Sequence, residues 1–269
     1  MPRAGVVLWQ AVALAAVLAS VGAALAAPEE MLRYLERADG VRFGPARFIA
    51  AGIAALTAGI IVIRLIVITI KLGLDTRRRR ERHRQLLDLL QTPNADERRV
   101  QVLAGPIPMA YCVPGRRLSA GRVVLTDSTV DLLSQPQVDA VIDHERGHLR
   151  ARHDLVREAF TALHVAFPTV VRSRAALAAV DHLLEVLADD GAAISNDRNE
   201  LAGALENLSP TDHSVQRRVR RLRTEPMAAS PRVALSLATF ALAIAVLAVP
   251  TIVLVWPWLD RAARTALGG

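Results

Sequence analysis

The sequence predicts an α-helical integral membrane protein with one inserted α+β domain, which is mostly helical and holds a small sheet. Three long apolar stretches, almost free of charge, have the length of membrane spans. The charged residues gather between the second and the third stretch. The mean hydropathy of +0.29 and the 52% of apolar residues exceed what a soluble domain of 269 residues needs. These values also exclude intrinsic disorder as the main state.

The first apolar stretch, residues 6–27, contains no charged residue and can cross about 30 Å of hydrocarbon as a helix. A second interpretation takes it as a secretory signal peptide. Arg3 would be the basic start, and Ala24-Leu25-Ala26 resembles a cleavage site. The run is longer than the apolar core of most signal peptides, which favours the membrane span.

The second stretch, residues 48–70, is apolar except for Arg64. We expect Arg64 to reach the membrane interface, with the helix continuing beyond it into water as far as Leu90. The third stretch, residues 233–259, contains Pro250 and Pro257. We expect Pro250 to kink or end that helix.

Basic residues lie next to two of these stretches, on the side of the polar domain. They are Lys71, Arg77, Arg78, Arg79, Arg80, Arg82, Arg84, Arg217, Arg218, Arg220, Arg221, Arg223 and Arg232. The positive-inside rule therefore places the polar domain in the cytoplasm. Arginines beside a span are typical of an anchor on anionic lipid, and the chain has few aromatic residues for base stacking. We expect the lipid bilayer as a partner and no nucleic acid.

These signals divide the chain into five parts. They are two N-terminal spans (about 6–27 and 46–70) with a short outside loop (1–74), a basic juxtamembrane helix (75–91), a cytoplasmic domain (92–231), a C-terminal span (232–259) and a short tail (260–269). The break Thr92-Pro93-Asn94 marks the start of the domain. Three short runs rich in Val and Leu, separated by Gly and Pro, predict strands at 99–103, 109–113 and 122–126.

Helical patterns follow the strands. Asp127 can cap a short helix through Leu133, and Ser134 with Gln137 forms a capping box for a helix that runs to about His153. Two further helices are expected at 154–171 and 173–193, with a break near Pro168. The first of these is apolar enough to lie against the bilayer.

The helix that begins near Gln137 contains the sequence His144-Glu145-Arg146-Gly147-His148. Residues four apart lie on one helix face, so both imidazoles can reach one zinc ion. Glu145 lies where a carboxylate can take a proton from the attacking water. The single cysteine, Cys112, cannot build a thiolate zinc cluster.

A catalytic zinc needs a third protein ligand. Glu185 is the best candidate, and Asp189, one turn later on the same face, can hydrogen-bond a ligand imidazole. His182 competes with Glu185 as the ligand because it lies one turn earlier. His83, His153 and His164 are interpreted as surface or packing residues.

H-E-x-x-H followed by E-x-x-A-D, with the segments 110–115, 123–126 and 148–154, resembles the zincin-like gluzincin membrane peptidases. The resemblance covers about residues 100–222. It is greatest to the BlaR/MecR-type regulatory zinc metallopeptidases of bacterial cell membranes, with the HtpX/Ste24-type peptidases as more distant relatives. We expect no extracellular penicillin-sensor domain of the kind that BlaR/MecR sensors carry after their last span.

The resemblance implies a role for each matching residue. His144, His148 and Glu185 would bind Zn²⁺, Glu145 would be the general base, and Asp189 would hold a ligand or donate a proton. The strand around Ala110 and Tyr111 would pair with an extended protein or peptide substrate. His213 could stabilise the oxyanion of the intermediate, and an exposed helix-capping histidine is an equally good interpretation.

Three functions remain open on the sequence. The first is a membrane zinc endopeptidase of the cytoplasmic face, which cleaves a transcriptional repressor or, like HtpX, misfolded membrane protein. The second is a non-catalytic metal-binding scaffold. The third, a lipid- or nucleic-acid-binding membrane protein, rests on net charge alone. Glu145 favours the enzyme, since a structural zinc site needs no general base.

Overall fold

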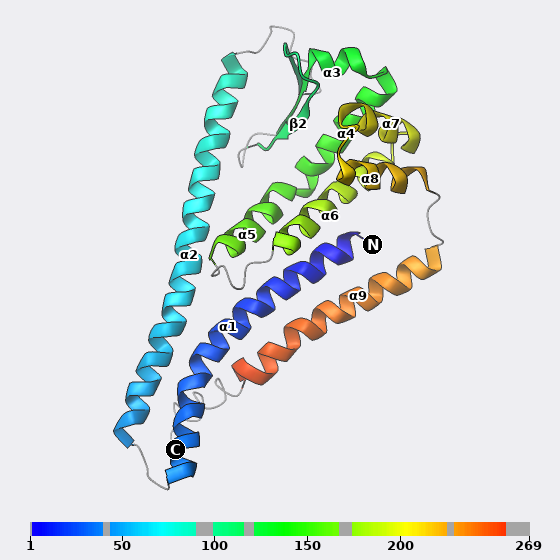
Figure 1. The fold of residues 1–269 in the computed structure, drawn as a ribbon. Helices are drawn as coiled ribbons and strands as arrows, with labels where there is room; N and C mark the ends of the chain where they lie inside the picture. The colour runs from blue at the N-terminus through cyan, green and yellow to red at the C-terminus, as the bar shows by residue number, and fades with distance from the viewer. Residues whose placement is uncertain are drawn as a thin grey trace.

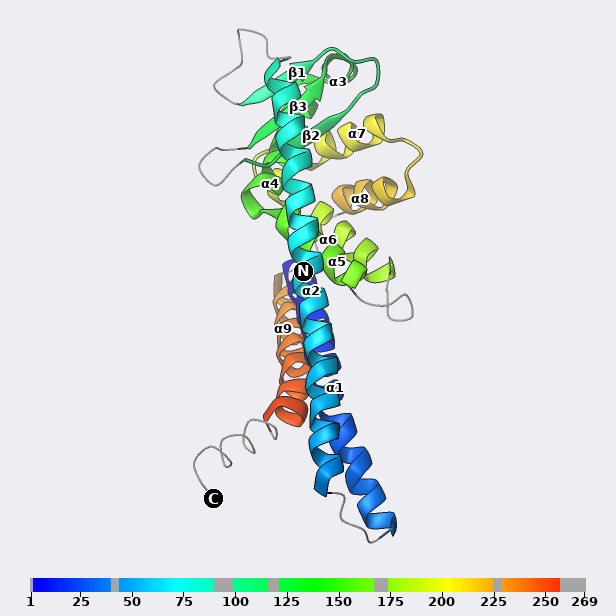
Figure 2. The ribbon, with the colours of Figure 1, turned by 90° about the vertical axis from the view of Figure 1, so that its left-hand side faces the viewer.

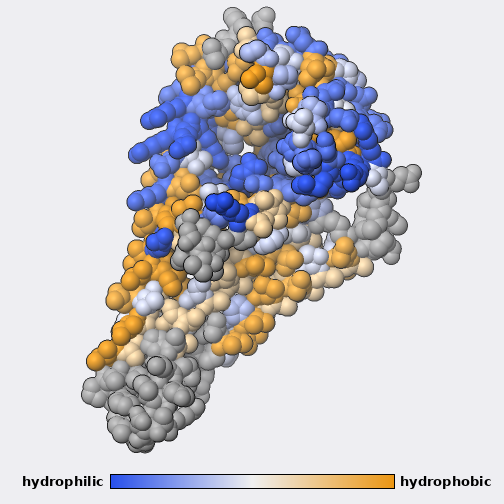
Figure 3. Space-filling view, viewed as in Figure 1, coloured by the Kyte–Doolittle hydropathy of each residue, from blue (hydrophilic) through white to orange (hydrophobic). Residues whose placement is uncertain are grey.

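The computed structural model describes residues 2–39, 44–89, 99–115, 121–166, 174–224 and 229–256. Three helices are long and apolar enough to cross a membrane: Pro2–Ala24, Gly52–Leu89 and Val233–Val253. Figure 1 shows them extending away from a smaller domain, and Figure 3 shows orange apolar residues along them and blue polar residues over the domain. The predicted fold class is confirmed.

The first of these helices is longer than expected, and the third ends where its proline predicted. Helix α1 (Pro2–Asp39) continues through Pro28, so much of the expected loop is helical. Helix α9 (Ala229–Pro250) ends at Pro250, and one π-helical turn, η1 (Thr251–Val255), follows it. This agrees with the predicted break, because proline has no N–H for the helical ladder. Pro257 lies outside the described residues.

Helix α2 (Gly44–Leu89) has 46 residues, which corresponds to about 69 Å. It continues from the membrane span into the polar domain (Figure 1). Arg64 Nε donates to the Ala166 carbonyl at 2.8 Å, at the end of helix α5 (His153–Ala166). Arg64 therefore satisfies a backbone carbonyl of the domain, which the interface interpretation did not anticipate.

The small sheet has the order β1-β3-β2, with β1 (Val100–Leu103) parallel and β2 (Ala110–Val113) antiparallel to the central β3 (Arg122–Thr126). Figure 2 shows α2 crossing this sheet, and Leu87 of α2 packs against Val113 and Val124. The opposite face packs on helix α4 (Gln135–Ala151), where Val141 is buried. β2 is left as an edge strand facing the cavity described below.

The helical part of the domain follows the predicted order with local differences. Its remaining helices are α3 (Asp127–Leu132), α6 (Arg174–Ala192), α7 (Arg198–Leu208) and α8 (His213–Arg223). Thr126 rather than Asp127 is the N-cap of α3. Helices α7 and α8 had no predicted bounds, and they begin after the capping side chains of Asp197 and Asp212. The expected breaks near Thr92 and Pro168 lie outside the described residues.

The start of α1 packs against the domain. Val6 lies in a buried cluster with Phe160, Val180 and Leu184 of α5 and α6. A Cβ atom at Gly5 would lie 3.1 Å from Leu183, so the two helices approach closely there. The start of the first apolar stretch therefore contributes to a buried contact with the domain.

Candidate active site

Helices α4 and α6 bring the predicted ligands together. His144 and His148 lie one turn apart on α4, and Glu185 faces them from α6. Gly147 of α4 faces Ala188 of α6 at this crossing, where a Cβ atom at position 147 would be in van der Waals contact with the Ala188 Cα atom at 3.4 Å. Both small residues belong to the motifs recognised in the sequence.

The three side chains form a triangle of possible metal ligands. His144 Nε2 and His148 Nε2 are 3.2 Å apart. Glu185 Oε2 lies 3.4 Å from His144 Nε2, and Oε1 lies 3.6 Å from His148 Nε2. Ligands about 2.1 Å from one tetrahedral zinc ion are about 3.4 Å from one another. The donor set and its spacing therefore fit zinc.

The outer nitrogen of His144 faces a buried ion pair. His144 Nδ1 lies 3.0 Å from Asp189 Oδ1. Arg218 of α8 binds both oxygens of Asp189, at 2.6 and 2.8 Å, and its Nη1 lies 3.1 Å from Glu185 Oε2. The side chain of Asp189 is 1% exposed and that of Arg218 is 8% exposed. The guanidinium group of α8 thus supports His144 through Asp189 and contacts Glu185 directly.

These contacts shift the pKa values of the groups involved. Burial lowers the pKa of His144, but hydrogen bonds with Asp189 and Glu185 raise it, to about 9 overall. Burial raises the pKa of Asp189, but hydrogen bonds from Arg218 and His144 outweigh it and the pKa is lowered. The pKa of Glu185 is lowered for the same reason by His144 and His148. Both carboxylates are therefore ionised at neutral pH.

The outer nitrogen of His148 has a different partner. His148 Nδ1 lies 2.8 Å from Nδ1 of His153, and the two rings meet edge to face. Burial and then the neighbouring His148 lower the pKa of His153 to about 4, so this imidazole is neutral. His153 was interpreted as a surface or packing residue. The structure places it against a candidate ligand.

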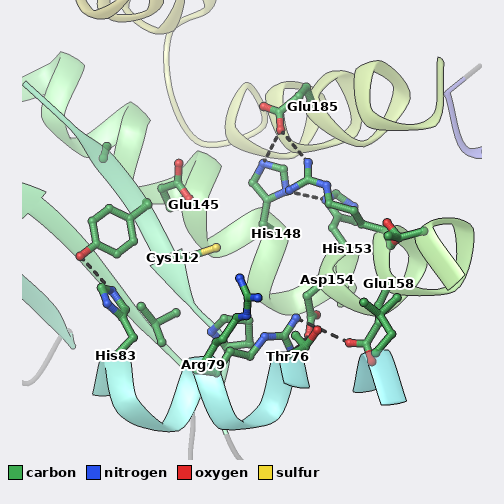
Figure 4. A pocket seen from close by; sticks show the side chains of 18 residues that line it. Thr76, Arg79, His83, Cys112, Glu145, His148, His153, Asp154, Glu158 and Glu185 are labelled. Carbon is green, nitrogen blue, oxygen red and sulfur yellow. Dashed lines mark hydrogen bonds and ion pairs between the residues drawn. The ribbon is translucent and has the colours of Figure 1, made fainter. Parts of the chain in front are cut away.

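A cavity of about 870 Å³ lies beside the triangle, between α2, β2, α4 and α5. Figure 4 shows Glu145, His148 and Glu185 on one side of it and Arg79 of α2 on the other. Cys112 of β2 and Glu145 both line the cavity. Burial and then the Glu145 charge raise the pKa of Cys112 to about 12, so the thiol beside the predicted general base is protonated.

The edge strand β2 presents backbone groups to this cavity. The Thr126 N–H donates to the Met109 carbonyl at 3.0 Å. Opposed residues of an antiparallel pair alternate between bonded and non-bonded positions, so Ala110 and Cys112 direct their N–H and C=O groups away from β3. Tyr111 bonds to β3 instead, and its side chain contacts His83 of α2. Among the described residues, no strand pairs with the free edge.

Two further sequence candidates lie outside the triangle. His213 is exposed at the first residue of α8 and does not line the cavity. It therefore fits the helix-terminus interpretation. The pKa of His182 is lowered by partial burial and then by nearby arginines, chiefly Arg217. His182 does not belong to the group of possible ligands, and Glu185 does.

Arg218 was expected only as part of the basic flank of the third span, and its role beside the ligands was not predicted. The signal was present. Arg218 shares the buried face of α8 with Val215, Val219 and Leu222, and an arginine at an apolar position of an amphipathic helix indicates a buried partner.

Comparison with known proteins supports the same assignment. The sequence profile of Peptidase family M48 matches residues 75–223, more than half of the chain. The chain belongs to this family of metallopeptidases. The matched region begins inside α2 and ends with α8, so it includes the triangle, Arg218 and all of the cavity lining except Leu72. Among curated proteins, none matches the chain.

Proposed function

We propose that the protein is a membrane-anchored zinc endopeptidase that hydrolyses peptide bonds on the cytoplasmic side of a bacterial cell membrane. The observation that carries the proposal is the triangle of His144, His148 and Glu185 beside a cavity that Glu145 lines. Membership in family M48 supports the reaction class. Zinc is proposed as the metal because two imidazoles and one carboxylate are the ligands of many catalytic zinc sites.

When bound to this triangle, zinc would supply Lewis-acid chemistry and make water more acidic. The other steps belong to the chain. Glu145 would take a proton from the water as its oxygen bonds to the peptide carbon, and would pass a proton to the nitrogen as the C–N bond breaks. We expect the protonated Cys112 thiol, which lines the same cavity, to donate to this carboxylate and orient it before the substrate arrives.

The proposed role of Asp189 is to orient His144. A ligand imidazole that uses Nε2 carries its proton on Nδ1, and the Asp189 carboxylate lies 3.0 Å from that nitrogen. Arg218 keeps Asp189 ionised and fixed in position. Asp189 is fully buried behind His144, which favours this positioning role over direct proton donation.

The proposed substrate is an extended segment of a protein that pairs with the free edge of β2. Ala110 and Cys112 would provide the backbone hydrogen bonds, since their N–H and C=O groups point away from β3. Tyr111 would contribute through its side chain on the α2 side of the cavity. A transcriptional repressor or a misfolded membrane protein could each present such a segment.

The first test is Glu145→Gln in cells, with the abundance and length of soluble and membrane proteins compared between variant and parent. Positioned proton transfer contributes about 10² to 10⁴ to a rate, so cleavage should fall by at least about 100-fold. Bound zinc should persist, because the substitution leaves all three ligands in place. Glu206→Gln is the matched control, as Glu206 pairs with Arg223 at an exposed site outside the cavity.

Each outcome of this test has a consequence. A shortened soluble DNA-binding protein would identify the repressor class, and shortened membrane proteins would identify quality control. Full proteolysis by Glu145→Gln would exclude the proposed mechanism. Absence of any cleavage by the zinc-loaded parent would favour the scaffold.

The proposed orientation can be tested by labelling. Thr211 is exposed between α7 and α8, so Thr211→Cys in a Cys112→Ser background provides one accessible thiol. A membrane-impermeant maleimide should label it only after the cells are opened. Labelling of intact cells would place the domain outside and exclude cytoplasmic substrates.

A further inference from the structure

His153 is buried, with 6% of its surface exposed, and its contact with His148 is specific. The two Nδ1 atoms are 2.8 Å apart, and the ring centroids are 4.8 Å apart at 83°. A histidine that only filled space would not need to align one ring nitrogen with another. One of the two Nδ1 atoms must therefore carry a proton and the other must accept it.

The proton can be assigned from the surroundings of His148. Its Nε2 atom faces His144 and Glu185, which is the position of a metal ligand. A neutral imidazole that ligates through Nε2 holds its proton on Nδ1 and donates it outward. His153 Nδ1 must then be the acceptor, so His153 carries its own proton on Nε2.

We propose that His153 is a positioning residue that fixes the ring orientation and the tautomer of His148, as Asp189 does for His144. This inference rests on the proposed function, because it assigns His148 as a metal ligand. His153 differs from Asp189 in being a neutral acceptor. It holds His148 without adding negative charge behind that ligand.

The chain reaches this position through an unusual turn. Arg152, between α4 and α5, has a φ angle of 51°, in the left-handed region that non-glycine residues seldom adopt. Helix α5 can therefore begin with only Arg152 between it and the end of α4, and His153 is directed back towards the preceding helix. If α4 continued as a regular helix, His153 would lie on a different face from His148, because it is five residues further along the chain.

Helix α5 is in turn anchored to the membrane helix α2 at both ends. Arg80 Nη1 donates to Asp154 at 2.9 Å, one residue after His153. Arg64 holds the Ala166 carbonyl at the other end. These contacts define the position of His153 relative to α2, the helix that forms one wall of the cavity.

Two polar substitutions test the acceptor directly. In His153→Asn the side-chain oxygen can occupy the place of Nδ1, whereas in His153→Gln it is displaced towards the place of Nε2. We expect zinc affinity to remain within about threefold of the parent in the Asn variant. It should fall by about 10- to 100-fold in the Gln variant, the usual effect of losing an outer partner of a ligand.

The measurement is the dissociation constant of Zn²⁺ for the full-length chain in detergent, from competition with a chromophoric chelator. A second readout is the visible absorption of the Co²⁺-substituted protein, which reports ligand geometry and should change for Gln alone. His164→Leu on the same helix is the control for loss of an imidazole from α5. Melting of the metal-free variants separates lost affinity from lost folding.

Equal zinc affinity of the Asn and Gln variants, with unchanged Co²⁺ spectra, would overturn the assignment of His153. Failure of the proposed function gives a different result. If His144→Ala retained stoichiometric zinc, the metal site itself would be wrong. If His144→Ala lost zinc while both His153 variants kept it, only the role of His153 would be wrong.

Discussion

The two candidate histidine ligands share one helix face and differ in what lies behind them. His144 Nδ1 faces Asp189, which a buried arginine holds with two hydrogen bonds. His148 Nδ1 faces the neutral imidazole of His153. The side chain of His144 is 7% exposed, and that of His148 is 13% exposed and lines the cavity.

This difference indicates two ways of fixing a ligand. Charge holds His144, and the carboxylate is stable there because Arg218 compensates for its desolvation. Hydrogen-bond geometry holds His148, and this depends on the turn at Arg152 and the anchoring of α5 to α2. The ion pair behind His144 lies entirely within the domain. The His153 contact behind His148 connects the site to the membrane helix α2 through α5.

The largest expected effect comes from removing the charge behind Asp189. Arg218→Met leaves a buried carboxylate without its partner, and such changes lower the free energy of unfolding by about 3 to 5 kcal/mol. Chemical denaturation of the metal-free protein in detergent would measure it. A loss below about 1 kcal/mol would mean that charge does not hold the His144 side of the site. Arg217→Met is the control, because Arg217 is exposed on the same helix.

The next effect distinguishes charge from hydrogen bonding at His144. Asp189→Asn retains an acceptor oxygen and removes the negative charge, and we expect zinc affinity to fall by about 10- to 100-fold. The competition assay with a chelator measures this fall. The comparison predicts a larger loss here than for His153→Asn, which removes no charge. Equal losses would show that the two outer partners act alike.

The smallest effect should come from the anchor between α5 and α2. Arg80→Gln removes the ion pair with Asp154, and we expect zinc affinity to fall by less than about tenfold, because Arg64 still holds the other end of α5. Arg82→Gln, at an exposed position of α2, is the control. Equal affinities of the Arg80→Gln and Arg82→Gln proteins would show that the anchor does not reach the site.

Much of the molecule could be predicted because local rules apply to it. The three spans follow from hydropathy over a fixed length, and the strands follow from short apolar runs between glycine and proline. His144 and His148 lie on one face of their helix because residues four apart in a helix do so. The motif around Glu185 indicated the third ligand, but only the packing of Gly147 against Ala188 brings it to the imidazoles.

The partners behind the ligands were decided by tertiary structure. Arg218 is 74 residues from His144. Its place on the buried face of α8 indicated a buried partner, but no local pattern identified that partner as Asp189. His153 was expected to end a continuous helix, and the break at Arg152 turned it towards His148. Local sequence determines which helices form and which face each residue takes. Which buried group meets which depends on how separate helices pack, because burying an ionised or hydrogen-bonding group is favourable only when its partner is already there.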